Sequence, residues 1–385
     1  MSVPFWRLSG FYFFYFAVLG IHLPYWGLYL KDCGFGPVEI GNLSALLVAT
    51  RIVAPTVWGW IADRTGRSLA IIRITLFLGA LIFAGFLFER GYRAMAGITV
   101  GFGFFWNAAL PQFEAITLAY LTEEPYRYSR IRLWGSVGFI AMVLGIGWIL
   151  DKQPVSVLPG ALTAILAANW LVTLTLPKPG GAHTGPVQVG LWQILKKPDV
   201  LAFLTVCMLL QVAHGPYYVF YSIYLKQFHY SSTLTGCLWA LGVLAEIVLF
   251  VNMRPLLARY SLRTILLVSL LLATLRWMLI GWGAADPVLL FAAQLLHAAS
   301  FGSAHVAAIH LVHHYFGREH QGKGQALYSS LSFGLGGMIG SLYSGYFWDW
   351  LGPEFVYSTA ALLCYLAFAI AYFWIGREYI LKPSH

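Results

Sequence analysis

Charged residues are scarce in this 385-residue chain: Asp, Glu, Lys and Arg make up 10% of it, whereas hydrophobic residues make up 59%. Soluble globular domains carry about 25% charged residues, so the composition excludes one. Cysteines are also few, and Cys33, Cys207, Cys237 and Cys364 are scattered without CxxC spacing. That spacing argues against a disulfide framework and against a metal knuckle, so we expect these four residues to be packing residues.

Three further signatures are missing. The first apolar segment follows Arg7 and continues through Gly20 and Pro24 without a small-residue cleavage site, which predicts a retained helix rather than a cleaved signal peptide. No P-loop motif occurs, so ATP-driven transport is disfavoured. Neither a catalytic cluster nor an attached soluble domain is visible, which argues against a membrane enzyme or a sensor. We therefore expect no enzyme activity and no cofactor.

Long apolar segments fill most of the chain. Segments of about 20 residues can span a bilayer, and they must be helices there because membrane backbone has to satisfy its own hydrogen bonds. Twelve such segments recur between short polar breaks, with approximate ranges 6–29, 38–62, 69–88, 93–121, 126–150, 155–176, 198–226, 232–252, 263–283, 287–315, 322–348 and 353–375. The sequence thus predicts an all-α integral membrane protein.

The longest polar break, 177–197, divides these helices into six and six. Its Gly and Pro content predicts a flexible cytosolic linker between an N-terminal bundle, 1–176, and a C-terminal bundle, 198–385. The halves also resemble each other, because a His-x-Pro-Tyr-aromatic run followed by Tyr-Leu-Lys begins at His22 and again at His214. Parallel repeats of this kind place a substrate site at their interface.

The net charge of +9 sets the orientation of the chain in the membrane and does not indicate a nucleic-acid partner. Most Lys and Arg residues fall in short loops on the side of the N-terminus, and basic loops stay in the cytosol. We expect both termini in the cytoplasm and the chain in a bacterial inner (plasma) membrane, with the lipid bilayer as its surroundings.

Two opposite charges, Glu114 and Arg132, lie 18 residues apart in the fourth and fifth segments. At a helical rise of about 1.5 Å per residue, both lie about 10 Å below the cytosolic edge. An ionisable group in hydrocarbon costs about 2.5–3.5 kcal/mol or more, so it tends to face a partner or a watery cavity and to mark a transport route. The alternative is a purely structural pair that ties two helices together.

Three more ionisable residues lie within apolar segments of the second half: Glu246, Arg276 and His297. An unperturbed His titrates near physiological pH, and a Glu does so when it is desolvated. These residues are therefore candidates for proton coupling. The structural alternative is a buried salt bridge between Glu246 and Arg276.

Histidines are dense near the end of the tenth segment, at His305, His310, His313, His314 and, just beyond it, His320. His310 and His314 have the i, i+4 spacing that can chelate a metal ion. No cysteine or acid completes the coordination shell, and these positions approach the headgroups. Interfacial histidines are the favoured interpretation and no metal site is expected, while His305 remains a candidate for the cavity.

The loop after the second segment contains a motif with family-level specificity. It reads G-W-I-A-D-R-T-G-R, with Gly59, Asp63, Arg64, Gly66 and Arg67 at its defining positions. It resembles the G-x-x-x-D-R-x-G-R loop of the major facilitator superfamily, in which two six-helix bundles form one transporter. The resemblance implies that this loop latches one conformation of the two halves and that the protein works as a monomer.

The helices around Glu114 and Arg132 resemble the lactose permease group, which has the same spacing between the acid and the arginine. In that group the pair binds substrate, and residues at the positions of Glu246, Arg276 and His297 serve sugar recognition and proton coupling. Two departures put sugar chemistry in doubt: Ser300 replaces a second carboxylate and Phe139 replaces a tryptophan.

The phenylpropionate permease branch of this superfamily is the closer match. It shares the R-L-W-G-S-V run at 132–137, the L-G-V-x-A-E run that ends at Glu246, and the Leu-Arg-Trp run around Arg276. This resemblance implies proton-coupled uptake of an aromatic carboxylate such as 3-phenylpropionate. A sugar or nucleoside symporter, or an exporter of the same fold, remains the alternative.

An anionic aromatic substrate also suits the residues themselves. Arg132, Arg51 and Arg276 are candidate forks for a carboxylate. Aromatic residues can form the apolar wall of such a site, and the candidates are Tyr25, Trp26, Tyr217, Tyr218 and Phe139. Packing or interfacial roles are commoner for aromatics in membrane proteins. We therefore expect Arg51, Tyr25, Tyr217, Tyr218 and Phe139 to bind substrate together with Glu114 and Arg132.

Overall fold

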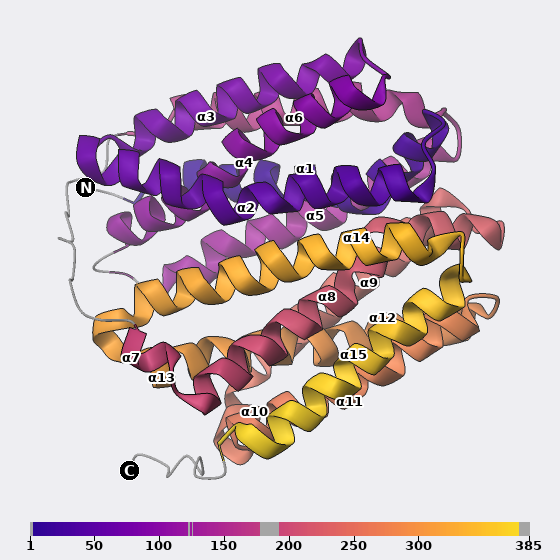
Figure 1. Ribbon diagram of the computed structural model, residues 1–385. Helices are drawn as coiled ribbons and strands as arrows, with labels where there is room; N and C mark the ends of the chain where they lie inside the picture. Colours follow the sequence, from indigo (N-terminus) through magenta and orange to yellow (C-terminus); the bar gives the residue numbers. More distant parts are fainter. Residues whose placement is uncertain (1–2, 122–123, 125, 178–191, 377–385) are drawn as a thin grey trace. The chain divides into compact units, whose positions relative to one another are not determined.

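A computed structural model describes residues 3–121, 124, 126–177 and 192–376 of the chain, and every regular element in these ranges is a helix. The helices form two compact units (Figure 1). One unit holds α1 to α6 together with Tyr230–Cys237, and the other holds α7, α8, the rest of α9 and all later helices. The predicted linker, 177–197, lies mostly outside the described residues.

The first unit is built around α1. Its helices are α1 (Phe5–Asp32), α2 (Pro37–Thr65), α3 (Ser68–Phe83) with the 3-10 turn η1 (Ala84–Leu87), α4 (Tyr92–Tyr120), α5 (Arg127–Leu150), the 3-10 turn η2 (Val155–Val157) and α6 (Leu158–Leu174). α1 packs against α5 and α6, while α4 packs against α2 and α3. α4 and α5, which carry Glu114 and Arg132, therefore belong to the same unit.

Glycines let α1 and α5 approach each other closely. A Cβ at Gly138 would collide with the carbonyl of Phe13, and a Cβ at Gly20 would lie 2.5 Å from the carbonyl oxygen of Phe139. Only glycine fits where two helix backbones come this near, as at other interfaces of small residues in membrane proteins. This packing fixes the face that α5 presents, and with it the direction of Arg132.

The second unit contains the remaining helices: α7 (Trp192–Leu195), α8 (Pro198–Gln227), α9 (Ser232–Val251), α10 (Met253–Arg259), α11 (Leu262–Gly283), α12 (Pro287–His297), the π-helix η3 (Ala298–Gly302), α13 (Ser303–Ser329), the π-helix η4 (Ser330–Gly336), α14 (Gly337–Trp348) and α15 (Gly352–Trp374). α11 runs beside α15 and also packs against α12 and α13 (Figure 1). α8 packs against α14 and α15. Arg276 on α11 and His297 on α12 are thereby neighbours.

Eleven helices of the described chain are long and apolar enough to cross a membrane. All twelve predicted segments are helical in the part of the chain that the structure describes, and the eleventh, 322–348, is divided into several helical elements. That segment comprises the end of α13, the π-helix η4 over the S-L-S-F-G-L-G run, and α14. α13 is itself interrupted at Gly317, whose φ of +61° separates the tenth span from the eleventh.

Residues 230–237 pack with the first unit through Asp151, which follows α5. The Oδ1 atom of Asp151 accepts from the backbone N–H of Ser232 at 2.6 Å, and Oδ2 accepts from that of Thr233 at 3.0 Å. Burial raises the pKa of Asp151, but hydrogen bonds from Thr233 and Ser232 outweigh it and hold the pKa below its ordinary value. Asp151 thus caps the start of α9, where backbone donors have no partner within the helix.

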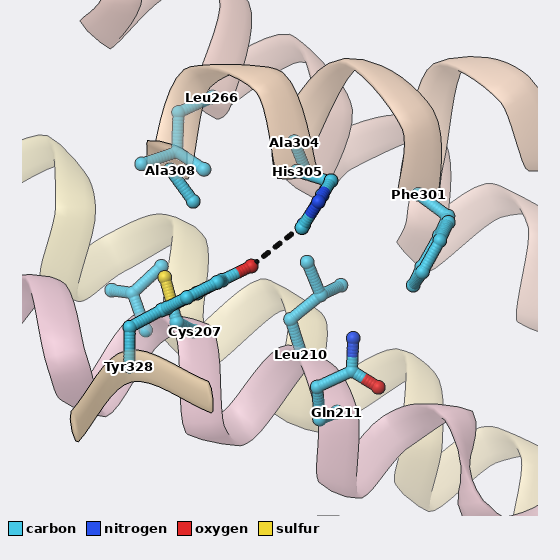
Figure 2. A pocket seen from close by; sticks show the side chains of 10 residues that line it. Cys207, Leu210, Gln211, Leu266, Phe301, Ala304, His305, Ala308 and Tyr328 are labelled. Carbon is cyan, nitrogen blue, oxygen red and sulfur yellow. Dashed lines mark hydrogen bonds between the residues drawn. The ribbon is translucent and has the colours of Figure 1, made fainter. Parts of the chain in front are cut away.

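Each unit contains a small internal pocket. In the first unit the pocket lies between His22, Trp26 and Ser44. In the second unit a pocket lies between α8, α11 and α13, where the ring of His305 points toward the hydroxyl of Tyr328 (Figure 2). Its walls are mostly apolar, and its polar side chains come from His305, Tyr328, Gln211 and Cys207.

Candidate functional site

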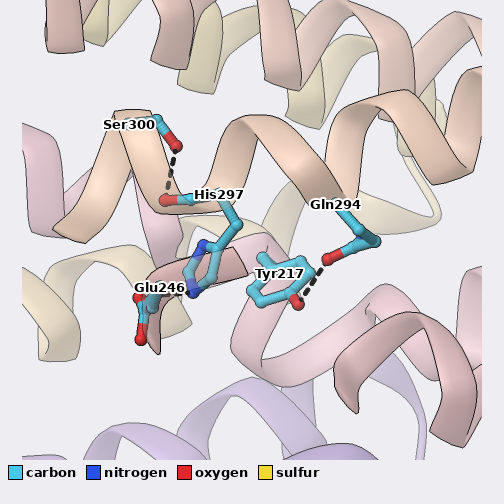
Figure 3. A network of polar contacts seen from close by, with 5 residues as sticks. All are labelled: Tyr217, Glu246, Gln294, His297 and Ser300. Atoms are coloured by element: carbon cyan, nitrogen blue, oxygen red, sulfur yellow. Dashed lines mark hydrogen bonds and ion pairs between the residues drawn. The ribbon is translucent and has the colours of Figure 1, made fainter. Parts of the chain in front are cut away.

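In the second unit, the centre of the candidate site is a contact between Glu246 on α9 and His297 at the end of α12. The Oε1 atom of Glu246 lies 3.1 Å from Nε2 of His297, and the two side chains are 15% and 9% exposed (Figure 3). The sequence predicted both as proton-coupling residues. Their contact shows that α9 and α12 present the two groups to each other, away from solvent.

Arg276 on α11 is completely buried beside this pair. Its guanidinium lies 4.4 Å from the ring centroid of Tyr217 and 4.4 Å from that of Trp277. All three guanidinium nitrogens are without a hydrogen-bond partner among the described residues. Arg276 interacts electrostatically with Glu246, but the described chain contains no direct salt bridge between them. The carboxylate of Glu246 therefore contacts His297, not Arg276.

A chain of polar contacts surrounds Tyr217, which was predicted to bind substrate. Its hydroxyl donates to Oε1 of Gln294 at 3.0 Å (Figure 3). Nε2 of Gln294 in turn donates to the hydroxyl of Tyr221 at 2.8 Å. The ring of Tyr218, also a predicted substrate residue, is 5.6 Å from that of Tyr217. Sequence reasoning missed Gln294, although its position three residues before His297 places both on one helix face.

Ser300 lies in the π-helix η3, which begins directly after His297. It is buried, and its hydroxyl donates to the carbonyl oxygen of His297 at 3.4 Å (Figure 3). This is the position where the lactose permease group has a second carboxylate. This chain therefore has an acid at Glu246 and none at Ser300. A π-helical turn such as η3 is typical of functional sites.

In the first unit, Arg132 on α5 lies over aromatic rings of α1. Its guanidinium is 3.9 Å from the ring centroid of Phe16 and 5.5 Å from that of Tyr12. Glu114 on α4 interacts electrostatically with Arg132, yet no N–O contact within 4.0 Å joins them in the part of the chain that the structure describes. The two predicted substrate residues are thus brought near each other without a closed salt bridge.

Sequence reasoning missed the aromatic partners of this charge pair. Tyr12 and Phe16 are one helical turn apart, and Tyr15 interacts electrostatically with Arg51, Glu114 and Arg132. The signal was the aromatic run at 11–16, whose members at i and i+4 share a face. Arg51 on α2, a predicted carboxylate fork, therefore lies close to the same cluster.

Two further predicted substrate residues of the first unit pack against neighbouring helices. Tyr25 is fully buried, and its hydroxyl donates to the carbonyl oxygen of Val143 at 2.7 Å. Phe139 is 7% exposed, and its backbone lies against Gly20. Both positions serve helix packing in this conformation, and a substrate contact for either residue stays a prediction.

The predicted latch motif was placed in a loop, but Gly59, Asp63 and Arg64 lie within α2, and only Gly66 and Arg67 lie between α2 and α3. Gly66 has φ of +63° and ends α2, with its N–H donating to the carbonyl oxygen of Ala62 at 2.8 Å. The left-handed conformation favours glycine, so Gly66 can make the tight turn that ends α2. Asp63, Arg64 and Arg67 are exposed, and the guanidinium of Arg64 lies 4.3 Å from the ring of Trp60. Gly59 lies beside the amide of Gln112 on α4.

Comparisons with known proteins give the family. The model of the MFS_1-like family matches residues 5–359. The chain is 31% identical to a probable 3-phenylpropionic acid transporter of Escherichia coli (strain K12), over 90% of this chain and 92% of that protein. It is 28% identical to the maltose permease of Geobacillus stearothermophilus, over 87% and 86% of the two chains.

The fold also matches a solved structure. A crystal structure of the nucleoside transporter NupG aligns with a TM-score of 0.84 at 19% identity, over 96% of this chain and 99% of that one. Twelve helical segments, a family model over most of the chain and a relative above 30% identity agree with one another. The chain therefore belongs to the MFS_1-like family, within the major facilitator superfamily of membrane transporters.

Proposed function

We propose that this transporter is a proton-coupled symporter that imports a small aromatic carboxylate, such as 3-phenylpropionate, by alternating access. The observation that carries the proposal is the buried contact between Glu246 and His297 beside Arg276, whose guanidinium has no hydrogen-bond partner among the described residues. A proton that binds or leaves Glu246 changes the net charge next to a buried guanidinium. Such a change can be linked to binding of an anion and to movement of helices.

Arg132 and Glu114 are the proposed substrate residues. Arg132 presents its guanidinium on an aromatic surface made by Phe16 and Tyr12, and a guanidinium can hold a carboxylate through two parallel hydrogen bonds. An aromatic acid has both a carboxylate and a ring that can pack on such a surface. The probable 3-phenylpropionic acid transporter, with 31% identity, points to the same class of substrate.

We further propose the arrangement that this mechanism needs. Bundles 1–176 and 198–385 move about the substrate, the linker 177–197 joins them in the cytosol, and the loop from Gly59 to Arg67 latches one conformation. The monomer lies in a bacterial inner membrane with both termini in the cytoplasm. Support comes from the loop motif, from the distribution of basic residues and from the two compact units.

A neutral substrate is the second candidate, because the relatives include a maltose permease and the matching fold includes a nucleoside transporter. Competition for uptake of labelled 3-phenylpropionate separates these classes. Excess unlabelled 3-phenylpropionate is expected to inhibit this uptake, whereas maltose and uridine are not. The direction of flux in intact cells separates an importer from an exporter.

The test of the proton role uses the purified protein in proteoliposomes with labelled 3-phenylpropionate. Glu246→Gln is expected to lose uphill uptake driven by a proton gradient but to keep substrate exchange, because exchange needs no net proton movement. Glu114→Gln is expected to lose both. Full uphill uptake by Glu246→Gln would show that Glu246 does not carry the proton.

A further inference from the structure

His305 lies two turns after His297 on the same helical segment, with Phe301 between them. The rings of His297 and Phe301 are 5.3 Å apart and 9° from parallel, and those of Phe301 and His305 are 6.2 Å apart and 4° from parallel. The three side chains form one stacked row across the π-helix η3. The ring of Phe301 stacks between the two imidazoles and holds them in line. Because Phe301 has no ionisable group, it blocks direct proton transfer between them.

Glu246 lies alongside this row. It contacts His297 at 3.1 Å, and it also interacts electrostatically with His305. A Cβ at Gly302 would lie 3.6 Å from Cγ of Glu246, so the side chain of Glu246 passes the π-helix next to Phe301. The carboxyl group of Glu246 therefore interacts with both imidazoles and can bridge the gap that Phe301 makes.

His305 also contacts Tyr328 at the wall of the pocket in the second unit. Its Nδ1 atom lies 3.0 Å from the hydroxyl of Tyr328 on the second part of α13, at the wall of the pocket in the second unit (Figure 2). Cys207 and Tyr328 are the other ionisable side chains that line this pocket, and the remaining polar side chain is that of Gln211. His305 thus lies between a buried acid and a small, mostly apolar pocket that also carries the side chains of Gln211 and Tyr328.

We propose that His305 is the proton carrier that follows Glu246, and that Tyr328 positions its ring. The proton leaves the carboxylic acid of Glu246 and binds the neutral imidazole of His305, so that a carboxylate and an imidazolium form. The imidazolium then releases a proton through the pocket to water, and the imidazole returns to its neutral form. The inference rests on the proposed proton-coupled function, and in the predicted orientation this route leads to the cytosol.

The test compares His305→Gln with His310→Gln, which changes an exposed histidine of the same helix outside the pocket. Proteoliposomes that contain a pH-sensitive dye report proton entry on addition of 3-phenylpropionate, and labelled 3-phenylpropionate reports exchange. His305→Gln is expected to slow proton entry and uphill uptake about tenfold or more, as loss of a general acid–base group does, with exchange unchanged. His310→Gln should match the wild type in both assays.

Tyr328→Phe keeps the ring and removes the contact with His305, so it tests positioning with little risk to folding. It is expected to lower proton entry less than His305→Gln does and to leave exchange unchanged. Equal coupling in the wild type and His305→Gln would overturn the relay, as would a parallel loss of exchange and coupling. If uptake by the wild type did not depend on the proton gradient, the proposed function itself would be overturned, and the relay with it.

Discussion

Arg276 is a fully buried charge in the second unit. A buried charge without a hydrogen-bond partner is destabilising by several kcal/mol unless other groups compensate. The rings of Tyr217 and Trp277 offset part of this cost, since a desolvated cation–π contact contributes about 2 kcal/mol. The rest is offset when an anion lies nearby. Arg276 is therefore a residue whose energy depends on the charge of Glu246, which is what a coupling site requires.

The position of the Arg132 guanidinium depends on Gly135, one helical turn away. A Cβ at Gly135 would lie 2.7 Å from Nη1 of Arg132 and 2.8 Å from Cδ2 of Phe16. Gly135→Ala is expected to displace the guanidinium from the ring of Phe16, because the end of an arginine moves more easily than the helix does. We expect KM for 3-phenylpropionate to rise about tenfold, equal to about 1.4 kcal/mol of binding, with little change in Tm.

The matched control is Gly145→Ala on the same helix, where an added Cβ meets no atom within 4 Å. Uptake kinetics in proteoliposomes and thermal unfolding in detergent measure the two effects. A wild-type KM in Gly135→Ala would show that the position of this guanidinium does not affect substrate binding.

At the scale of elements, the helical segments follow from hydropathy, but their rotation and their irregular turns do not. The apolar runs of α9, α11 and α12 predicted three helices with one or two ionisable residues each. They did not reveal that Glu246 contacts His297 and not Arg276, since this depends on how neighbouring helices pack. The π-helices η3 and η4 were also missed, because hydropathy does not distinguish a π-helical turn from an α-helical one.

The start of α9 gives a pH-dependent prediction. The pKa of Asp151 is held below its ordinary value of 3.8, so its carboxylate stabilises the folded state above that pH, and the contribution is lost as the pH falls through the lower folded-state value. Asp151→Asn is expected to cost about 1 kcal/mol or less at pH 7, because the cap is solvent-exposed and screened.

Thermal unfolding in detergent from pH 7 to pH 3 measures this effect. The difference in Tm between the wild type and Asp151→Asn should shrink toward the acid end. A difference that stays constant over the whole range would show that the charge of Asp151 does not contribute to the cap.

For the whole molecule, the sequence was sufficient for the fold class and insufficient for the substrate. Twelve apolar segments, the repeat at His22 and His214 and the turn at Gly66 all follow from local patterns. The surroundings of Arg132 are made by Tyr12, Phe16 and Glu114 together, and these come from helices far apart in the chain. The partners of a charge inside a membrane are set by packing of small residues such as Gly138, which hydropathy does not describe.

Orientation in the membrane can be tested with the native cysteines. Cys33 follows α1 and is partly exposed, whereas Cys207 and Cys364 are buried. If both termini are cytoplasmic, Cys33 faces the outside, and a membrane-impermeant maleimide should label it in spheroplasts without permeabilisation. Burial raises the pKa of the Cys33 thiol above its ordinary value of 9.0, so the thiolate is scarce at neutral pH. Labelling should therefore accelerate from pH 7 to pH 9.

Cys33→Ser is the control, because it removes this site and leaves Cys237, which is also partly exposed, as the remaining accessible thiol. The label that Cys33→Ser loses is the label on Cys33. If that label appears only after permeabilisation, the loop that contains Cys33 is cytoplasmic. The whole orientation would then be reversed, and the proton route past His305 would lead out of the cell instead of into it.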